Sequence, residues 1–243
     1  MHIDNLILEI TRKCNLRCEH CMRGDPQRLV MSNEIINSTL QHVDSIGSLC
    51  LTGGEPSLAP EVIENLWLSI WWKKVRVDGF DITTNACPHN RYGRFLKAVD
   101  KFYNYCDSPD VCSLAISRDQ YHGYVPSRAR IFERYMKDIY QWEKPPYFYP
   151  EKRGTYIEEP IGEGRALDTG AGWAPMKEQK PWEIEDNYVM ENEVYISANG
   201  NVTSCCDMSF ARIDRECKGN VLTTPLPDII KSFCIDKSIA KEA

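Results

Sequence analysis

The sequence predicts an α/β fold in which helices cover a parallel sheet. Strand-like and helix-like apolar patterns alternate through the first two-thirds of the 243 residues, which is the order typical of parallel sheets. Cysteine-rich and glycine-rich segments directly follow two of the strands, at the edge where such sheets bind ligands. The chain is 42% hydrophobic and 26% charged, a balance that excludes a disordered or collagen-like chain.

The first two strand–helix pairs have clear boundaries. A buried strand at Leu6–Ile10 precedes a helix that Ser32 can cap and that Gly47 ends. A short strand at Ser48–Leu51 comes next, followed by a helix that opens at Pro60. We expect the tryptophans of this second helix to lie mostly on its buried face.

The same pattern then occurs twice more. Strands are predicted at Phe80–Thr84 and Val111–Ser117, and apolar residues at helical spacing predict helices around residues 92–99 and 131–139. Beyond residue 140 the regularity weakens, and one further strand is predicted at Thr155–Glu159.

The C-terminal part of the chain predicts a β-hairpin. Its two strands are Val194–Ser197 and Val202–Ser204, joined by the turn Asn199-Gly200. We therefore divide the chain into a main domain over residues 1–188 and a small extension over residues 189–243.

Composition limits the partners and the compartment. The formal net charge is −6, which argues against nucleic acid as the main partner, because phosphate binding needs a basic surface. No run of eighteen apolar residues is present, so we expect no membrane span. The N-terminus lacks a basic region followed by a long apolar stretch, so we expect no signal peptide and a cytoplasmic protein.

The strongest chemical signal is the segment C-N-L-R-C-E-H-C, which places Cys14, Cys18 and Cys21 on a loop directly after the first strand. With eleven cysteines and no export signal, metal or cluster ligation is favoured over disulfides. A four-iron cluster normally takes four thiolates, so three from one loop would leave one iron open to another ligand. The alternative, a zinc knuckle, needs a fourth ligand, and His20 is constrained by its neighbours.

A second signal follows the second strand. Thr52-Gly53-Gly54-Glu55-Pro56 lies at the same sheet edge as the cysteine loop. Two glycines let the backbone approach a ligand closely, and the Glu55 carboxylate could receive an ammonium group. Alone, this segment is equally a tight turn with Glu55 at a helix start. Paired with the cysteine loop, it becomes specific.

Together, CxxxCxxC after the first strand and GGEP after the second resemble the radical S-adenosylmethionine (SAM) enzymes. The resemblance implies a partial (β/α)6 barrel with a small C-terminal β-hairpin extension, and a 4Fe-4S cluster held by Cys14, Cys18 and Cys21. It also implies that the open iron binds the amino and carboxylate groups of SAM. Reductive cleavage of SAM would then give a 5′-deoxyadenosyl radical that takes a hydrogen atom from the substrate.

The same resemblance assigns further residues to SAM. Gly53, Gly54 and Glu55 would receive the methionine amino group, and the backbone of His20 would lie near the adenine. Ser117, at the end of the fourth strand, would contact the ribose. Arg165, in a Gly-Arg-Ala segment, would meet the carboxylate, and a solvated loop arginine is the alternative for it. We assign no catalytic acid or base.

The C-terminal extension resembles the SPASM or twitch extensions of peptide-modifying radical SAM enzymes. Such extensions bind auxiliary clusters, and the extension here has enough cysteines for one. However, adjacent cysteines seldom both bind one cluster, and the later CxxC pairs of that pattern are absent. A hairpin without a cluster is therefore favoured. The four cysteines concerned are Cys205, Cys206, Cys217 and Cys234.

The resemblance leaves the substrate open. The C-terminal extension over residues 189–243, called the tail below, favours modification of a peptide or protein segment, which the tail would help to hold. The cluster would receive its electron from an external one-electron donor such as a flavodoxin or ferredoxin. One alternative is an activase of a glycyl radical enzyme. Another, from a different class, is a zinc- or cluster-binding interaction module without catalysis, which would not need Gly53-Gly54-Glu55.

Overall fold

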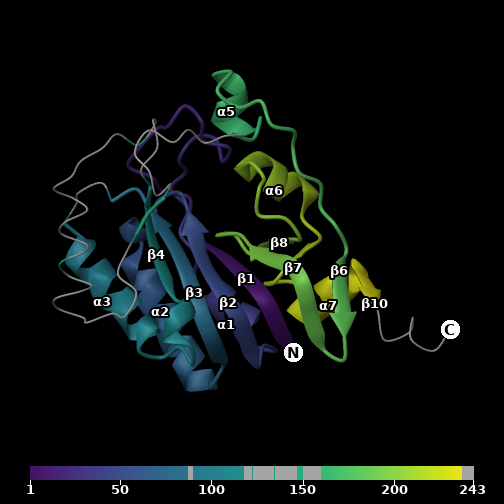
Figure 1. Cartoon of the computed structure of the whole chain (residues 1–243). Helices are drawn as coiled ribbons and strands as arrows, with labels where there is room; N and C mark the ends of the chain where they lie inside the picture. The colour runs from purple at the N-terminus through teal and green to yellow at the C-terminus, as the bar shows by residue number, and fades with distance from the viewer. Residues whose placement is uncertain (87–89, 118–121, 123–133, 135–146, 150–159, 237–243) are drawn as a thin grey trace.

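A computed structural model gives the fold and describes residues 1–86, 90–117, 122, 134, 147–149 and 160–236. The strands among these residues form one ten-stranded sheet (Figure 1). They are β1 His2–Thr11, β2 Ser45–Gly53, β3 Arg76–Thr84, β4 Ser113–Ser117, β5 Tyr147–Tyr149, β6 Trp182–Glu185, β7 Tyr188–Ile196, β8 Asn201–Thr203, β9 Gly219–Asn220 and β10 Cys234–Asp236.

The sheet topology confirms the predicted α/β fold with a parallel sheet. Strands β1 to β5 are adjacent in chain order, and each is parallel to the next. On the other side of β1 lies β7, also parallel, followed by β6 and β10. The strand predicted at Thr155–Glu159 lies outside the described residues. All five leading strands therefore end at one edge, which is where the two motifs lie.

Helices connect the leading strands, as predicted. Helix α1 lies between β1 and β2, α2 between β2 and β3, and α3 between β3 and β4. The helix predicted around residues 131–139 falls outside the described part. Within the described ranges, no helix has the length and apolar character needed to cross a membrane. The helices are α1 Asn33–Leu40, α2 Pro60–Lys73, α3 Tyr92–Tyr103, α5 Gly164–Asp168, α6 Phe210–Glu216 and α7 Leu226–Ser232, with short 3-10 turns η1 Pro56–Leu58 and η2 Pro109–Val111.

The predicted end of the first helix was wrong, although its start is confirmed. The Ser32 side chain accepts a backbone N–H of the first turn as the N-cap. The helix ends at Leu40, and Gly47 lies inside β2 instead. A Cβ at Gly47 would lie 2.9 Å from the backbone oxygen of Asp4 on β1. This glycine therefore serves close strand packing and not a helix end.

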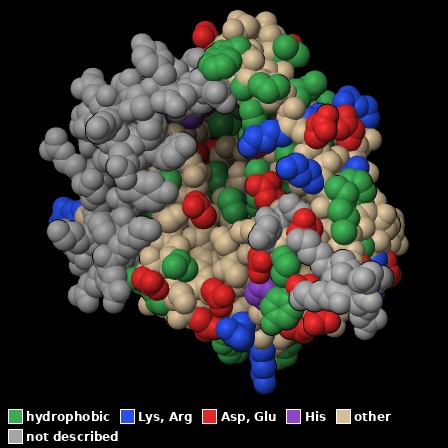
Figure 2. Space-filling model, turned by 45° about the vertical axis from the view of Figure 1, so that its right-hand side comes forward, with side chains coloured by type: hydrophobic (Ala, Val, Ile, Leu, Met, Phe, Trp, Pro, Cys, Tyr) green, Lys and Arg blue, Asp and Glu red, His purple; other side chains and the backbone are tan. Residues whose placement is uncertain are grey.

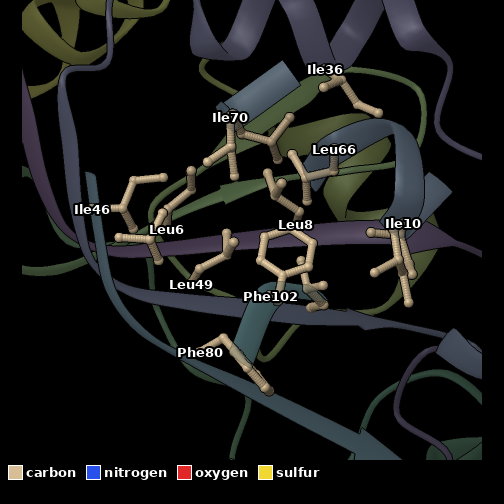
Figure 3. Packing of buried hydrophobic residues seen from close by; sticks show 14 of the residues in the cluster. Leu6, Leu8, Ile10, Ile36, Ile46, Leu49, Leu66, Ile70, Phe80 and Phe102 are labelled. Carbon is tan, nitrogen blue, oxygen red and sulfur yellow. The ribbon is translucent and has the colours of Figure 1, made fainter. Parts of the chain in front are cut away.

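One face of the sheet packs against the helices (Figure 3). Leu6, Leu8 and Ile10 alternate along β1 and are fully buried in this layer, together with Ile36 of α1 and Leu66 of α2. Each such side chain contributes about 1.5–3 kcal/mol when it leaves water. This buried layer holds the strands of the sheet in place. It therefore also positions the sheet edge that carries the two motifs.

Helix α2 corrects the expectation for its tryptophans. Trp67 packs against the core, but Trp71 is 53% and Trp72 is 79% exposed. The buried stripe of this helix is formed by aliphatic residues such as Leu66 and Ile70. A helix of this size has room for one apolar stripe, and the two later tryptophans lie outside it.

The predicted C-terminal hairpin is confirmed, and it belongs to the same sheet. Tyr195 of β7 lies opposite Thr203 of β8, and Gly200 in the turn has a φ of +87°, which favours glycine. β7 also pairs with β1. The predicted boundary between residues 188 and 189 thus falls within a strand of a continuous sheet.

Candidate functional site

A cavity of about 490 Å³ lies at the carboxyl ends of the leading strands. Figure 2 shows a recess on the face turned toward the viewer, with acidic and basic side chains near it. The cavity brings together residues from the cysteine loop, the turn after β2, the end of β4 and α5. Every residue that the sequence assigned to the cluster or to SAM lines it: Cys14, Cys18, His20, Cys21, Gly53, Gly54, Glu55, Ser117 and Arg165.

The cysteine loop folds so that its three thiols share this cavity. The backbone N–H of Cys21 donates to the carbonyl of Cys18 at 3.2 Å, and Gly24 donates to Cys21 at 3.4 Å. All three cysteines are half-buried. In the described part of the chain, no three His, Cys, Asp or Glu side chains converge on a single metal ion. A cubane cluster makes a different demand, because each cysteine binds a different iron, and the donor set fits it.

The Cys14 thiol is held in its neutral form by its surroundings. Burial raises its pKa to about 11, and the nearby Glu55, Cys18 and Cys21 add to the effect, against a hydrogen bond from the backbone N–H of Leu16. Metal ligands must be deprotonated, so iron binding here would release a proton.

The two glycines of the turn let it approach the cysteine loop itself. A Cβ at Gly53 would lie 2.1 Å from the backbone oxygen of Thr11, and one at Gly54 would lie 2.3 Å from that of Lys13. The backbone N–H groups of Gly54 and Glu55 donate to the same two carbonyls, at 2.7 and 2.8 Å. The sequence suggests that these glycines admit a ligand. Their observed contacts fix the turn against the residues just before Cys14.

The Glu55 carboxylate organises the ends of two strands. It is 1% exposed and accepts hydrogen bonds from the backbone and hydroxyl of Ser57, at 3.0 and 2.6 Å. It also accepts from the hydroxyl of Thr84 at 2.6 Å and the backbone N–H of Asn85 at 2.8 Å. Glu55 thus caps η1 and holds the end of β3, which agrees with the tight-turn interpretation. Its contact with SAM stays a prediction.

Glu55→Gln is expected to lower the free energy of unfolding by about 1–3 kcal/mol. The substitution replaces one carboxylate oxygen with an amide NH2 group, which cannot accept the hydrogen bonds made to that oxygen. Denaturant unfolding measures this loss. Glu61→Gln is the matched control, since Glu61 pairs with Arg91 at the surface and should change stability by less than about 1 kcal/mol. Equal small losses in both variants would contradict the organising role of Glu55.

Arg165 contacts the cysteine loop. Its Nη1 donates to the carbonyl of Cys18 at 3.2 Å, and its Nη2 donates to the carbonyl of Gly24 at 3.1 Å and to Asp25 at 2.5 Å. The hydrogen bond from Arg165 lowers the pKa of Asp25. The resemblance assigns this guanidinium to the SAM carboxylate, whereas the contacts observed here hold the loop that carries the cysteines.

The rest of α5 supports the same loop. Ala166 donates its backbone N–H to the carbonyl of Cys21 at 3.3 Å, and the Thr169 hydroxyl donates to that of Glu19 at 2.8 Å. Gly164 has a φ of +54°, and a Cβ there would lie 2.3 Å from the backbone oxygen of Met22. The Gly-Arg-Ala segment therefore clamps the cysteine loop.

Two other residues that the sequence assigned to SAM, His20 and Ser117, line the cavity as well. His20 meets His122 edge-on, with ring centroids 5.2 Å apart. Ser117 lies at the end of β4, as predicted. That each of them contacts SAM stays a prediction.

A buried polar network joins β1 to the tail, and sequence reasoning missed it. Arg12 donates to Glu9 at 2.7 Å and to both carboxylate oxygens of Asp214 at 2.8 Å. The Tyr195 hydroxyl and the Ala198 backbone N–H also donate to Glu9, at 2.5 and 3.0 Å. Burial raises the pKa of Tyr195 well above its usual value, so the phenol keeps its proton and donates a hydrogen bond to Glu9.

Several further residues line the cavity without having been predicted, and Arg23, Asp207 and Phe210 are three of them. Asp207 forms an ion pair with Lys177, and the ring of Phe210 lies under the guanidinium of Arg12. Arg23 follows Cys21 by two residues, so proximity to the motif could have suggested it. No sequence signal marks the other two, which come from the tail.

The four cysteines considered for an auxiliary cluster lie in different surroundings. Cys205 is buried against Tyr195, and Cys206 packs beside it. Cys217 is the C-cap residue of α6, and Cys234 lies in β10 next to β6. None of the four lines the cavity described above.

Comparison with known proteins gives relatives for part of the chain. No protein-family model matches it. A probable GTP 3′,8-cyclase of Methanococcus maripaludis is 32% identical over 100 residues, which is 37% of this chain and 31% of that protein. The GTP 3′,8-cyclase of Microcystis aeruginosa is 37% identical over 71 residues, covering 26% of this chain and 22% of that protein. The chain thus spans less than a third of the length of these relatives.

Solved structures resemble nearly the whole chain. Native anSMEcpe with bound AdoMet and Cp18Cys peptide matches with a TM-score of 0.58 at 14% identity, covering 96% of this chain and 82% of the other. Native anSMEcpe with bound AdoMet matches with a TM-score of 0.51 at 16% identity, over 96% and 83%. At these identities the comparison shows a shared fold.

Proposed function

We propose that this chain is a radical SAM enzyme that binds a 4Fe-4S cluster and SAM and modifies a peptide or protein segment, and its motifs, its fold and its partial relatives support this. The observation that carries the proposal is the shared cavity. Three thiols of one loop and the Gly-Gly-Glu turn line the same space, although they come from different strands. A zinc- or cluster-binding module would need the thiols but not the turn.

The residues divide the task in a definite way. Cys14, Cys18 and Cys21 would bind three irons of the cluster, which would leave the fourth iron open to SAM. Gly53 and Gly54 let the turn pack against the loop, and this turn would bind the methionine end of SAM. When bound, the cluster and SAM supply the reductive cleavage that releases a 5′-deoxyadenosyl radical. The protein orients the cofactors and excludes water.

The tail supports a peptide substrate. Asp207 and Phe210 come from it and line the cavity beside the cysteine loop. The structure of anSMEcpe with a bound peptide shares the fold over 82% of its length. A peptide substrate would place one segment in such a cavity while the rest of the peptide stays outside. An open site suits this mode of binding better than a small closed site does. An external one-electron donor such as a flavodoxin or ferredoxin would reduce the cluster in the cytoplasm.

The curated relatives favour a second candidate, a nucleoside triphosphate. They are GTP 3′,8-cyclases, but the chain covers 31% of the first one's length. Titration with GTP separates the two candidates, because binding of GTP at micromolar concentration with no peptide binding would favour the nucleotide.

Electron paramagnetic resonance tests the proposed binding of SAM to the cluster. Anaerobically reconstituted protein, reduced with dithionite, should give the signal of a one-electron-reduced cluster. Saturating SAM should change that signal, because it adds ligands to the open iron. S-adenosylhomocysteine with its uncharged sulfur is a suitable comparison ligand. A signal that is identical with and without SAM would contradict the proposal.

A further inference from the structure

Among the described residues, no carboxylate forms an ion pair with the guanidinium of Arg23, which is buried in the cavity wall. The residue is 8% exposed. Its Nη1 donates to the carbonyl of Met208 at 2.7 Å, and its guanidinium carbon lies 5.2 Å from the ring centroid of Tyr195. The partly or fully buried Arg12, Arg165 and Arg212 all pair with carboxylates. Arg23 is therefore unusual, since buried charges are normally paired.

The carboxylates nearest to Arg23 are already engaged. Glu9 and Asp207 act on Arg23 through space, but neither forms an ion pair with it. Glu9 is bound by Arg12 and the Tyr195 hydroxyl, and Asp207 pairs with Lys177. The negative charges of Glu9 and Asp207 stabilise the positive charge of the guanidinium from a distance, but neither carboxylate accepts a hydrogen bond from it.

In the part of the chain that the structure describes, most of the N–H donors of the Arg23 guanidinium remain available to a ligand. A guanidinium carries five N–H donors in a planar fork, and the contact with Met208 uses one of them. Arg23 lines the cavity next to the cysteine loop. A carboxylate would match both the charge and the geometry, because it can accept two parallel hydrogen bonds from one arginine.

We propose that Arg23 binds a carboxylate of the substrate, so that the segment modified by this enzyme carries an acidic side chain near the reacting position. This inference rests on the proposed function and names the group that the site recognises. The carboxylate of SAM has the same chemistry, and depth in the cavity separates the two sources.

Arg23 reaches deeper than the rim where SAM would be held. Gly53 pairs with Thr11 at the end of β1. Tyr195 pairs with Ile7, four residues earlier on that strand, and its hydroxyl extends only to Glu9. The guanidinium packs on this ring, on the side of the cavity formed by the tail. It therefore faces the space below the Gly-Gly turn, which a substrate would occupy.

Two peptide probes test the inference on the cluster-loaded protein with SAM present. Acetyl-Gly-Gly-Glu-Gly-Gly-amide should bind about tenfold or more tightly than its glutamine counterpart, the difference expected for a charged hydrogen bond. Arg23→Gln should abolish this preference, and Arg23→Lys should keep part of it, because lysine retains the charge but not the fork. Arg215→Gln, at a residue exposed on α6, should leave it unchanged.

The outcomes separate this inference from the proposed function. No preference in the wild-type protein, including no binding of either peptide at millimolar concentration, would overturn it without any variant. If Arg23→Gln weakens binding of SAM but not of decarboxylated SAM, the guanidinium serves the SAM carboxylate and the inference is wrong. Wild-type protein that assembles no cluster or binds no SAM would instead contradict the proposed function.

Discussion

Replacing Cys14, Cys18 and Cys21 together with alanine is expected to lower the iron content from about four atoms per chain, the content of one cubane, to none. Each single replacement should also remove the cluster, because the three thiols are the protein ligands that the cavity offers to it. Anaerobic reconstitution, followed by iron and sulfide analysis and absorption spectroscopy, measures the loss.

Two further cysteines provide the matched control. Cys217→Ala and Cys234→Ala change thiols outside the cavity, so both variants should keep the full iron content. Loss of iron in either one would indicate an auxiliary cluster in the tail, against the cluster-free hairpin that the sequence favours. Full iron content in the triple variant would overturn the assignment of the cysteine loop.

Arg12→Met is expected to lower the free energy of unfolding by about 3–5 kcal/mol, the cost of leaving a buried charge without its partner. Arg12 is 1% exposed and Glu9 is fully buried, so the variant leaves the Glu9 carboxylate with hydrogen bonds from Tyr195 and Ala198 but without the Arg12 cation. Denaturant unfolding under reducing conditions measures the change.

A surface ion pair on α6 provides the control for this effect. Arg215 is 68% exposed and pairs with Glu216, so Arg215→Met should cost less than about 1 kcal/mol. Adding Glu9→Leu to Arg12→Met should recover part of the lost stability, because it removes the unpaired charge. A loss below about 1 kcal/mol in Arg12→Met would show that the network contributes little.

Most of the residues that sequence reasoning brought to the cavity are carried by short contiguous motifs. Cys14, Cys18 and Cys21 lie within eight positions, and Gly53 and Glu55 lie within three. Each motif follows a buried strand, and parallel strands end at one edge. These facts are local, so the sequence alone is enough to predict that the two motifs share a cavity.

The contacts that it missed join residues far apart in the chain. Arg12 and Asp214 are 202 positions apart, and Arg165 and Cys18 are 147 apart. No local pattern encodes such a pairing, because it depends on how the tail and α5 pack around the loop. The same holds for Glu55, whose hydrogen bonds to Thr84 and Asn85 cross from β2 to β3.

Glycine was the residue type whose role was hardest to infer from sequence. Gly47 was predicted to end a helix and instead lets β2 approach β1. Gly53 and Gly54 were predicted to admit a ligand, and their closest contacts are backbone atoms of Thr11 and Lys13. A glycine marks a close approach or an unusual φ, but the sequence does not say which partner comes close.

Quantification of 5′-deoxyadenosine tests the central claim most directly. Reconstituted wild-type protein, incubated anaerobically with SAM and dithionite, is expected to release 5′-deoxyadenosine, while the variant lacking Cys14, Cys18 and Cys21 releases none. Wild-type protein that carries a full cluster and yet forms no 5′-deoxyadenosine, or equal amounts from both proteins, would contradict the account.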